Sequence, residues 1–137
     1  MRFKWVLLFV IMLLLAGCQS SYWVLEKDRI GEGGSELELY ANYLQMHEDV
    51  KGYQVFTISE GRKMVIVSLG SSEKDKKLEV SGVKYSPTET IVTVKRKPAP
   101  KANEKNPFIL IGLDKIEGDL IVQDESGDRF EETDYQQ

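Results

Sequence analysis

Hydrophobic and polar residues alternate along most of the chain from Tyr53 onward, and a period of two is typical of β-strands. We therefore predict short strands, separated by turns rich in glycine, serine and proline, at 53–58, 63–69, 77–85, 89–96, 107–113, 120–123 and 128–130. The run 107–113 is almost continuously apolar, so we expect it to be a central strand. Residues 97–106, which contain two prolines, are predicted to be a loop.

Before the strands, residues 35–52 show the only clear helical spacing. An apolar stripe recurs at intervals of three and four and consists of Leu37, Tyr40, Ala41 and Leu44. Ser35 and Glu38 have the spacing of a capping box, in which each side chain bonds the other residue's backbone N–H. With Gly52 as the stop, we predict a helix at about 36–49. The chain is therefore expected to be mainly β (α+β), a small antiparallel β-sandwich or partly open barrel of six to seven strands with one N-terminal helix.

The first 20 residues have a different pattern. Arg2 and Lys4 precede an unbroken apolar run from Trp5 to Gly17. A basic start, an apolar core and an exit of small residues are typical of an export signal. The apolar run has 13 residues, fewer than the roughly 20 that a membrane-spanning helix needs.

The end of this signal, Leu15-Ala16-Gly17-Cys18, resembles the lipobox of bacterial lipoproteins. The resemblance implies that residues 1–17 are a signal peptide and that the Cys18 thiol receives a diacylglyceryl group. Two acyl chains are enough for stable attachment to a bilayer. The protein is thus expected on the extracytoplasmic face of the cell membrane. A cleaved secretory signal, or an uncleaved anchor helix, is the alternative interpretation.

After the anchor we predict a lipidated, flexible tether at 18–34, because Gly31-Glu32-Gly33-Gly34 favours flexibility. Trp23 could instead lie in the lipid interface or begin a first strand. A single globular domain is predicted at 35–137. The signal holds two of the 18 basic residues and none of the 22 acidic ones, so the mature chain is net negative. This composition argues against nucleic-acid binding, which needs a dense basic surface.

Few residues point to catalysis or to a cofactor. His47 is the only histidine and Cys18 the only cysteine, so neither a catalytic triad nor a zinc site can be assembled, and we expect no enzyme activity and no cofactor. The turn from Asp124 to Asp128 resembles a calcium loop, but its glycine is at the fourth position, whereas an EF-hand has its glycine at the sixth. A hairpin turn is the simpler interpretation. A calcium site at Asp124 and Asp128, completed by Asp114, Glu117 or Asp119, is the alternative.

Basic residues concentrate in two segments of this acidic chain. Plain solvent-exposed loops are the simplest interpretation, and the two segments are also candidate partner-binding loops. The basic residues are Lys74, Lys76 and Lys77 in one segment, and Lys95, Arg96, Lys97, Lys101 and Lys105 in the other. If these residues face the membrane, each could add about 1 kcal/mol of attraction to anionic lipid. If they face outward, they could dock an acidic protein partner.

The strand sequences of residues 65–130 resemble the C-terminal domain of the protease complex subunit PrcB. The similarity lies in 64–70, 78–85, 91–94, 106–111 and 122–127. It implies a small, non-enzymatic β domain in an exported protein that associates with a membrane or cell-surface protease. The sequence thus predicts a lipid-anchored, non-catalytic interaction module. The alternative is a small-ligand or calcium-binding lipoprotein that serves a transporter or sensor.

Overall fold

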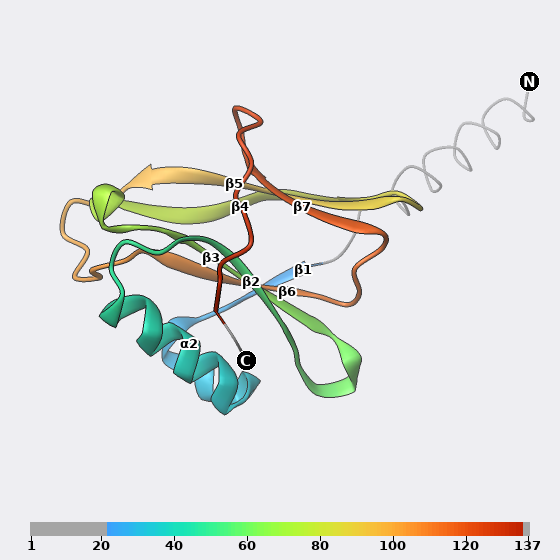
Figure 1. The fold of residues 1–137 in the computed structure, drawn as a ribbon, viewed down its shortest axis with the longest axis horizontal. Coiled ribbons are helices and arrows are strands. Elements are labelled where there is room, and N and C mark those ends of the chain that lie inside the picture. Colours follow the sequence, from blue (N-terminus) through green and yellow to red (C-terminus); the bar gives the residue numbers. More distant parts are fainter. Residues whose placement is uncertain (1–21, 136–137) are drawn as a thin grey trace, which may run out of the picture.

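The computed structural model describes residues 22–135, which form two β-sheets packed face to face and one α-helix on the outer face of the larger sheet (Figure 1). The four-stranded sheet consists, in spatial order, of β1 (Tyr22–Leu25), β6 (Phe108–Leu113), β3 (Lys63–Leu69) and β2 (Lys51–Thr57). The three-stranded sheet consists of β4 (Lys76–Tyr85), β5 (Glu89–Pro98) and β7 (Asp119–Asp124). The predicted mainly β fold with a sandwich architecture is confirmed. Every strand pair is antiparallel except β5 and β7, which run parallel.

The strand β3 lies between two hydrophobic cores. Its residues Val65 and Val67 pack between the sheets, whereas Met64 and Ile66 pack against the helix α2 (Ser35–Met46). Because both faces of β3 and β6 are buried, their sequences are almost continuously apolar. The central position predicted for 107–113 is confirmed, since β6 lies between β1 and β3.

The start of α2 differs from the prediction. The predicted apolar stripe from Leu37 to Leu44 is buried, but the helix has no capping box. Ser35 is already the first helical residue, and the cap position is Gly34, with no side-chain hydrogen bond to it. Gly34 has φ 115°, a conformation that glycine adopts at low cost, where the chain turns from the preceding 3-10 helix into α2. Ser35 therefore comes one position too late to cap the helix.

Gly52 does not end the helix, as the sequence had suggested. The helix ends at Met46, and Gly52 lies within β2 with φ 144°. A Cβ at this position would lie 2.3 Å from the carbonyl oxygen of Glu131. Glycine is thus needed because the C-terminal segment passes directly over β2.

The predicted tether is wrong for residues 22–33, which belong to the folded domain. Tyr22–Leu25 pair with β6, and Lys27–Gly33 form the 3-10 helix η1. The alternative that Trp23 begins a first strand is correct: its ring lies where a Cβ on Gly112 would be, only 2.0 Å from the nearest ring atom. The Trp23 ring thus packs over β6 at Gly112, and the folded domain includes residues 22–33 in addition to the predicted 35–137.

The C-terminal residues 128–133, here called the C-terminal strap, join the two sheets on one side of the sandwich. The turn at 125–127 is present, but the strand predicted at 128–130 is reduced to a single bridge between Gln123 and Arg129. The backbone N–H of Phe130 donates to the carbonyl of Val122 in β7 at 2.8 Å. Tyr53 of β2 then bonds the backbone of residues 131 and 133, at 2.9 Å in each case. The strap leaves β7 to reach β2, which prevents a longer pairing with β7.

Candidate interaction surface at the basic end

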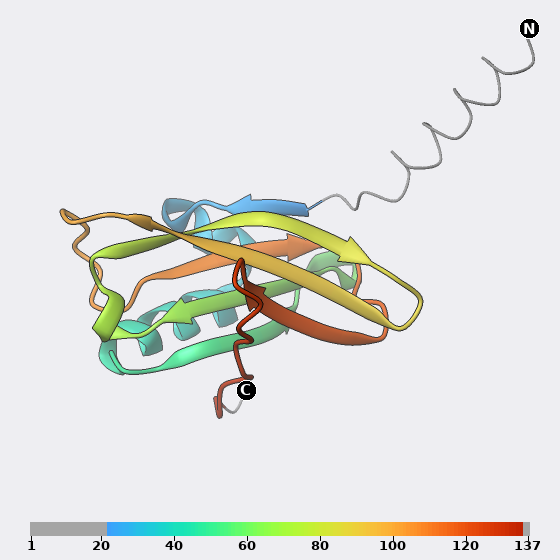
Figure 2. The same ribbon diagram turned by 90° about the horizontal axis from the view of Figure 1, so that it is seen from above.

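The sandwich has two distinct ends. Tyr22, where the described chain begins, pairs with Leu113, and Leu113 also pairs with Lys63. The β3–β4 connection at 70–75 and the β5–β6 loop at 99–107 lie at the opposite end, here called the basic end, as Figure 2 shows from above. Eight residue steps along β5, from Thr90 to Pro98, separate the two ends by about 26 Å.

The structure brings the two predicted basic segments together at this end. Lys76 and Lys77 begin β4, and Lys95, Arg96 and Lys97 end β5, its antiparallel neighbour. The loop that the sequence placed at 97–106 therefore starts only at residue 99, because Pro98 still pairs with Lys76 at the end of the ladder. Lys74, Lys101 and Lys105 lie in the connections on either side.

Within the ladder, Lys77 lies directly opposite Lys97, and Glu79 lies opposite Lys95. Like charges directly opposite each other on one sheet face destabilise the pair. Lys77 is 60% exposed and has Glu79 at 3.9 Å, which relieves part of this repulsion. For Lys74, Lys76, Lys95, Lys97 and Lys101, no ion pair is found within residues 22–135. These five ammonium groups form a cationic surface at one end of an acidic protein.

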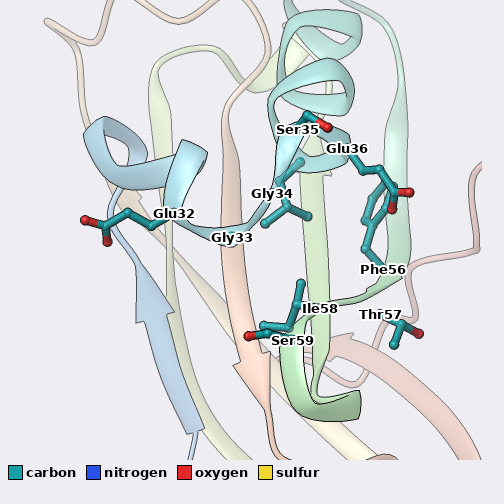
Figure 3. A pocket seen from close by; sticks show the side chains of 10 residues that line it. Glu32, Gly33, Gly34, Ser35, Glu36, Phe56, Thr57, Ile58 and Ser59 are labelled. Atoms are coloured by element: carbon teal, nitrogen blue, oxygen red, sulfur yellow. The ribbon is translucent and has the colours of Figure 1, made fainter.

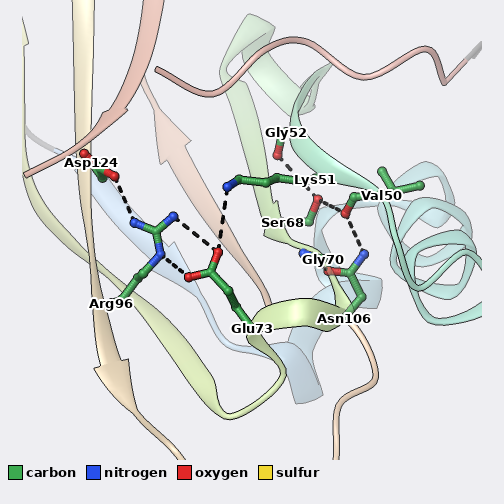
Figure 4. A network of polar contacts seen from close by, with 9 residues as sticks. All are labelled: Val50, Lys51, Gly52, Ser68, Gly70, Glu73, Arg96, Asn106 and Asp124. Carbon is green, nitrogen blue, oxygen red and sulfur yellow. Dashed lines mark hydrogen bonds and ion pairs between the residues drawn. The ribbon is translucent and has the colours of Figure 1, made fainter. Parts of the chain in front are cut away.

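Arg96, predicted as a binding residue, instead holds the basic end together. Its guanidinium donates to both carboxylate oxygens of Glu73, at 2.6 and 3.3 Å, and to Asp124 Oδ2 at 2.9 Å (Figure 4). Partial burial acts to lower the pKa of Arg96, but the hydrogen bonds and charges of Glu73 and Asp124 outweigh it and raise the pKa. Arg96 stays charged and links the β3–β4 connection to β5 and β7.

Asn106 fixes the second connection at this end and was not found by the sequence analysis. Its side chain is fully buried, accepts the N–H of Gly70 at 2.8 Å and donates to the carbonyl of Val50 at 2.8 Å (Figure 4). Ser68, also fully buried, donates to the same Val50 carbonyl at 3.0 Å. The only signal in the sequence was a polar residue directly before an apolar strand. These buried polar contacts thus hold the β3–β4 connection and the β5–β6 loop against the segment 47–50, which connects α2 to β2.

The calcium alternative at Asp124 and Asp128 receives no support from this geometry. Asp124 Oδ1 accepts the backbone N–H groups of Ser126 and Asp128 at 2.9 and 3.0 Å, and Arg96 occupies Oδ2. Burial acts to raise the pKa of Asp124, but these hydrogen bonds outweigh it and hold the pKa below its usual value. No cluster of three metal-ligating side chains occurs in the described part of the chain. Asp124 shapes the hairpin turn.

His47 lies at the exposed end of α2. It is the residue after the last helical turn, and its ring packs against Tyr43 with centroids 4.3 Å apart. Its backbone N–H donates to the Tyr43 carbonyl at 2.8 Å. These are the contacts of a C-cap residue at the end of α2.

A shallow groove lies between the start of α2 and the end of β2 (Figure 3). Glu32, Gly34 and Glu36 line one wall, and Phe56 and Ile58 line the other. Its charged groups are carboxylates, and its walls carry neither a histidine nor a cysteine. This groove offers less specific chemistry than the basic end, so we place the candidate site at the basic end.

The lipobox and Cys18 lie outside the described residues, so lipidation stays a prediction. Between residues 22 and 135, no helix has the length and hydrophobicity required to cross a bilayer.

Comparisons with known proteins place the chain among its relatives. It is 87% identical to the uncharacterized protein YycS of Bacillus subtilis (strain 168) over 137 residues, which cover both chains completely. No family model matches the chain, and the resemblance to PrcB therefore stays a prediction. No solved structure matches it either. Full-length similarity at this level shows that the chain belongs to the YycS family.

Proposed function

We propose that the protein is a lipoprotein of the extracytoplasmic face of the cell membrane, anchored through Cys18, and that its domain is a non-catalytic module that binds an acidic protein partner. The observation that carries this proposal is the gathering of basic residues from two segments at the end farther from Tyr22.

The anchor and the domain are close together in the chain. Only residues 19–21 separate Cys18 from Tyr22, the first residue of β1. Four residue steps span at most about 14 Å when fully extended. The basic end, about 26 Å further along the sandwich, is therefore the part best placed to reach a partner. Of the two orientations that the sequence allowed, this spacing favours the one in which the lysines face a protein.

Rigid presentation of the lysines supports the same function. Binding sites gain affinity when their groups are held in place before the partner arrives. Arg96 and Asn106 hold the connections that carry Lys74 and Lys101, and the ladder holds Lys77 beside Lys97. Retaining this like-charge pair has a cost in stability, which an acidic partner would relieve. A membrane or cell-surface protease is the class of partner that the resemblance to PrcB implies.

Two experiments test the two halves of the proposal. Cys18→Ser should shift the protein from the membrane fraction to the soluble fraction and remove the acyl mass. A protein of unmodified mass in the wild type would refute the anchor.

For the partner, a photo-crosslinking residue at Lys76 or Lys101 in intact cells should capture one product of discrete mass. That product should be lost in Lys97→Glu/Lys74→Glu and kept in the matched control Lys84→Glu/Lys115→Glu, whose lysines are exposed at the other end of the sandwich. Equal loss in both variants would show that the basic end is not the binding surface.

A further inference from the structure

The strand β1 exposes apolar side chains on a face that is buried elsewhere in the same sheet. Tyr22 and Val24 are 40% and 41% exposed, yet their partners across the ladder, Leu113 and Ile111, have no exposed surface. Tyr22 and Val24 stay exposed because the facing sheet has only three strands, so the fourth strand of the larger sheet, β1, has no strand opposite it. Figure 2 shows β1 at the margin of the sandwich.

The outer edge of β1 lacks the protection that the other edges have. On the opposite side, the C-terminal strap bonds β7 and β2. The edge strand β4 has a bulge between Val80 and Gly82 and three lysines, devices that discourage strand pairing. The sequence of β1 is Tyr-Trp-Val-Leu, without a charge, and within residues 22–135 this strand pairs only with β6. An apolar edge of this kind requires a cover.

The groups around β1 match a lipid headgroup region. Tryptophan and tyrosine are enriched where protein meets the membrane interface, and basic side chains are attracted to anionic lipid. The guanidinium of Arg62 lies over the Trp23 ring, 5.0 Å from its centroid. Tyr22 and Val24 lie on the face of β1 that continues the core between the sheets. Trp23 and Arg62 lie on the opposite face, which packs toward α2. The exposed edge of β1 therefore carries interfacial groups on both of its sides.

We infer that the exposed edge of β1, with Tyr22 and Val24 on one face and the Trp23–Arg62 pair on the other, docks on the membrane interface, so that the domain rests on the bilayer. This inference depends on the proposed anchor, which keeps Tyr22 within about 14 Å of the acylated residue. The interfacial layer on each side of the hydrocarbon core is about 5–8 Å thick, so β1 can reach it without unfolding. Docking at β1 fixes the tilt of the domain relative to the membrane plane. It thereby also fixes the distance of the basic end from the membrane surface.

The mature chain offers a direct probe, because removal of residues 1–17 eliminates Trp5 and leaves Trp23 as the only tryptophan. The full-length lipidated protein would be reconstituted in vesicles of phosphatidylcholine and phosphatidylglycerol that include a lipid with a nitroxide on its headgroup. Trp23 fluorescence should fall about twofold compared with nitroxide-free vesicles. Tyr22→Ser/Val24→Ser should lose at least half of this quenching. The matched control Leu39→Ser/Met46→Ser, which removes the other exposed large apolar pair, on α2, should keep it.

The outcomes separate the two proposals. An unmodified mass would refute the anchor, whereas lipidated wild-type protein whose Trp23 is not quenched would refute docking at β1. The wild-type measurement needs no variant, so it decides even if the double variant unfolds. Quenching that is unchanged in a folded Tyr22→Ser/Val24→Ser variant would also overturn the inference. A crosslinked dimer joined through β1, without lipid quenching, would assign this edge to a second copy of the chain instead.

Discussion

Lys77 and Lys97 are directly opposite each other on neighbouring antiparallel strands, near the end of the β4–β5 ladder. The next pair on the same face, Glu79 and Lys95, is complementary. The register therefore concentrates positive charge toward the end of the ladder. A sheet that served only as a scaffold would gain stability from an acidic residue at either position.

The first prediction follows from this pair. Lys97→Glu replaces a repulsive cross-strand pair with an attractive one, so the free energy of unfolding should rise by about 0.2–1 kcal/mol. Crosslinking to the partner should fall in the same variant. Urea denaturation measures the first effect. Lys84→Glu, whose cross-strand neighbour is the uncharged Ile91, is the control and should leave stability within about 0.5 kcal/mol of the wild type. A less stable Lys97→Glu protein would contradict the account.

The second prediction concerns the buried amide at the basic end. Asn106→Ala leaves the Gly70 N–H without its acceptor, whereas the Val50 carbonyl keeps the Ser68 hydroxyl as a donor. An unsatisfied buried polar group costs about 1–3 kcal/mol, so the variant should lose about that much unfolding free energy. Asn103→Ala, an exposed position in the same loop, is the control and should change little. Equal stability of the two variants would show that Asn106 does not hold the connections.

The elements that the sequence predicted well are those with a regular hydrophobic period. The stripe of α2, the β2–β3 hairpin and the two-sided burial of β6 were visible as residue spacing. The sequence did not predict features that depend on contacts distant in the chain. The parallel pairing of β7 with β5 arises because the chain crosses to the other sheet and returns, and no local pattern encodes that crossing.

The sequence predicted which basic residues form the candidate site but not how they are arranged. Charge counts identified the lysines, but only the β4–β5 register places Lys77 beside Lys97. Arg96 appeared equivalent to its neighbours in sequence, yet strand alternation turns it toward Glu73 and Asp124. The tether prediction was wrong because the glycine-rich run 31–34 indicates flexibility locally, whereas the apolar residues 22–25 become a strand only by pairing with β6, which lies more than 80 residues further along the chain.

The third prediction is a pH dependence. The folded-state pKa of Asp124 is below its ordinary value of about 3.9, so folding favours the ionised form. The stability that this group contributes is complete above the ordinary pKa and is lost as the pH falls through the lower, folded-state value. Wild-type unfolding free energy should therefore decrease from about pH 5 downward. Asp124→Asn and Arg96→Met should both flatten this slope in urea denaturation. A wild-type slope in both variants would rule out the link between Arg96 and Asp124 as its source.

The fourth prediction tests the packing of β1 against β6. Gly112→Ala puts a methyl group about where the Trp23 ring lies, so the ring and β1 must move. Forcing an extra methyl group into a packed site costs about 1–3 kcal/mol, and Trp23 emission should shift to longer wavelength as the ring meets water. Gly82→Ala is the matched control, because its Cβ meets no atom within 4 Å. Unchanged emission in Gly112→Ala would mean that Trp23 is not held against β6.

The C-terminal strap bears on the order in which the chain can fold. Residues 128–133 are synthesised after all seven strands, yet they supply backbone partners for strands in both sheets. Until they emerge, the backbone groups of Tyr53 and Val122 that bond the strap have no protein partner there. The two sheets are therefore joined on this side only in the last step of synthesis. Under the proposed export, a translocation channel would receive the chain before that closure.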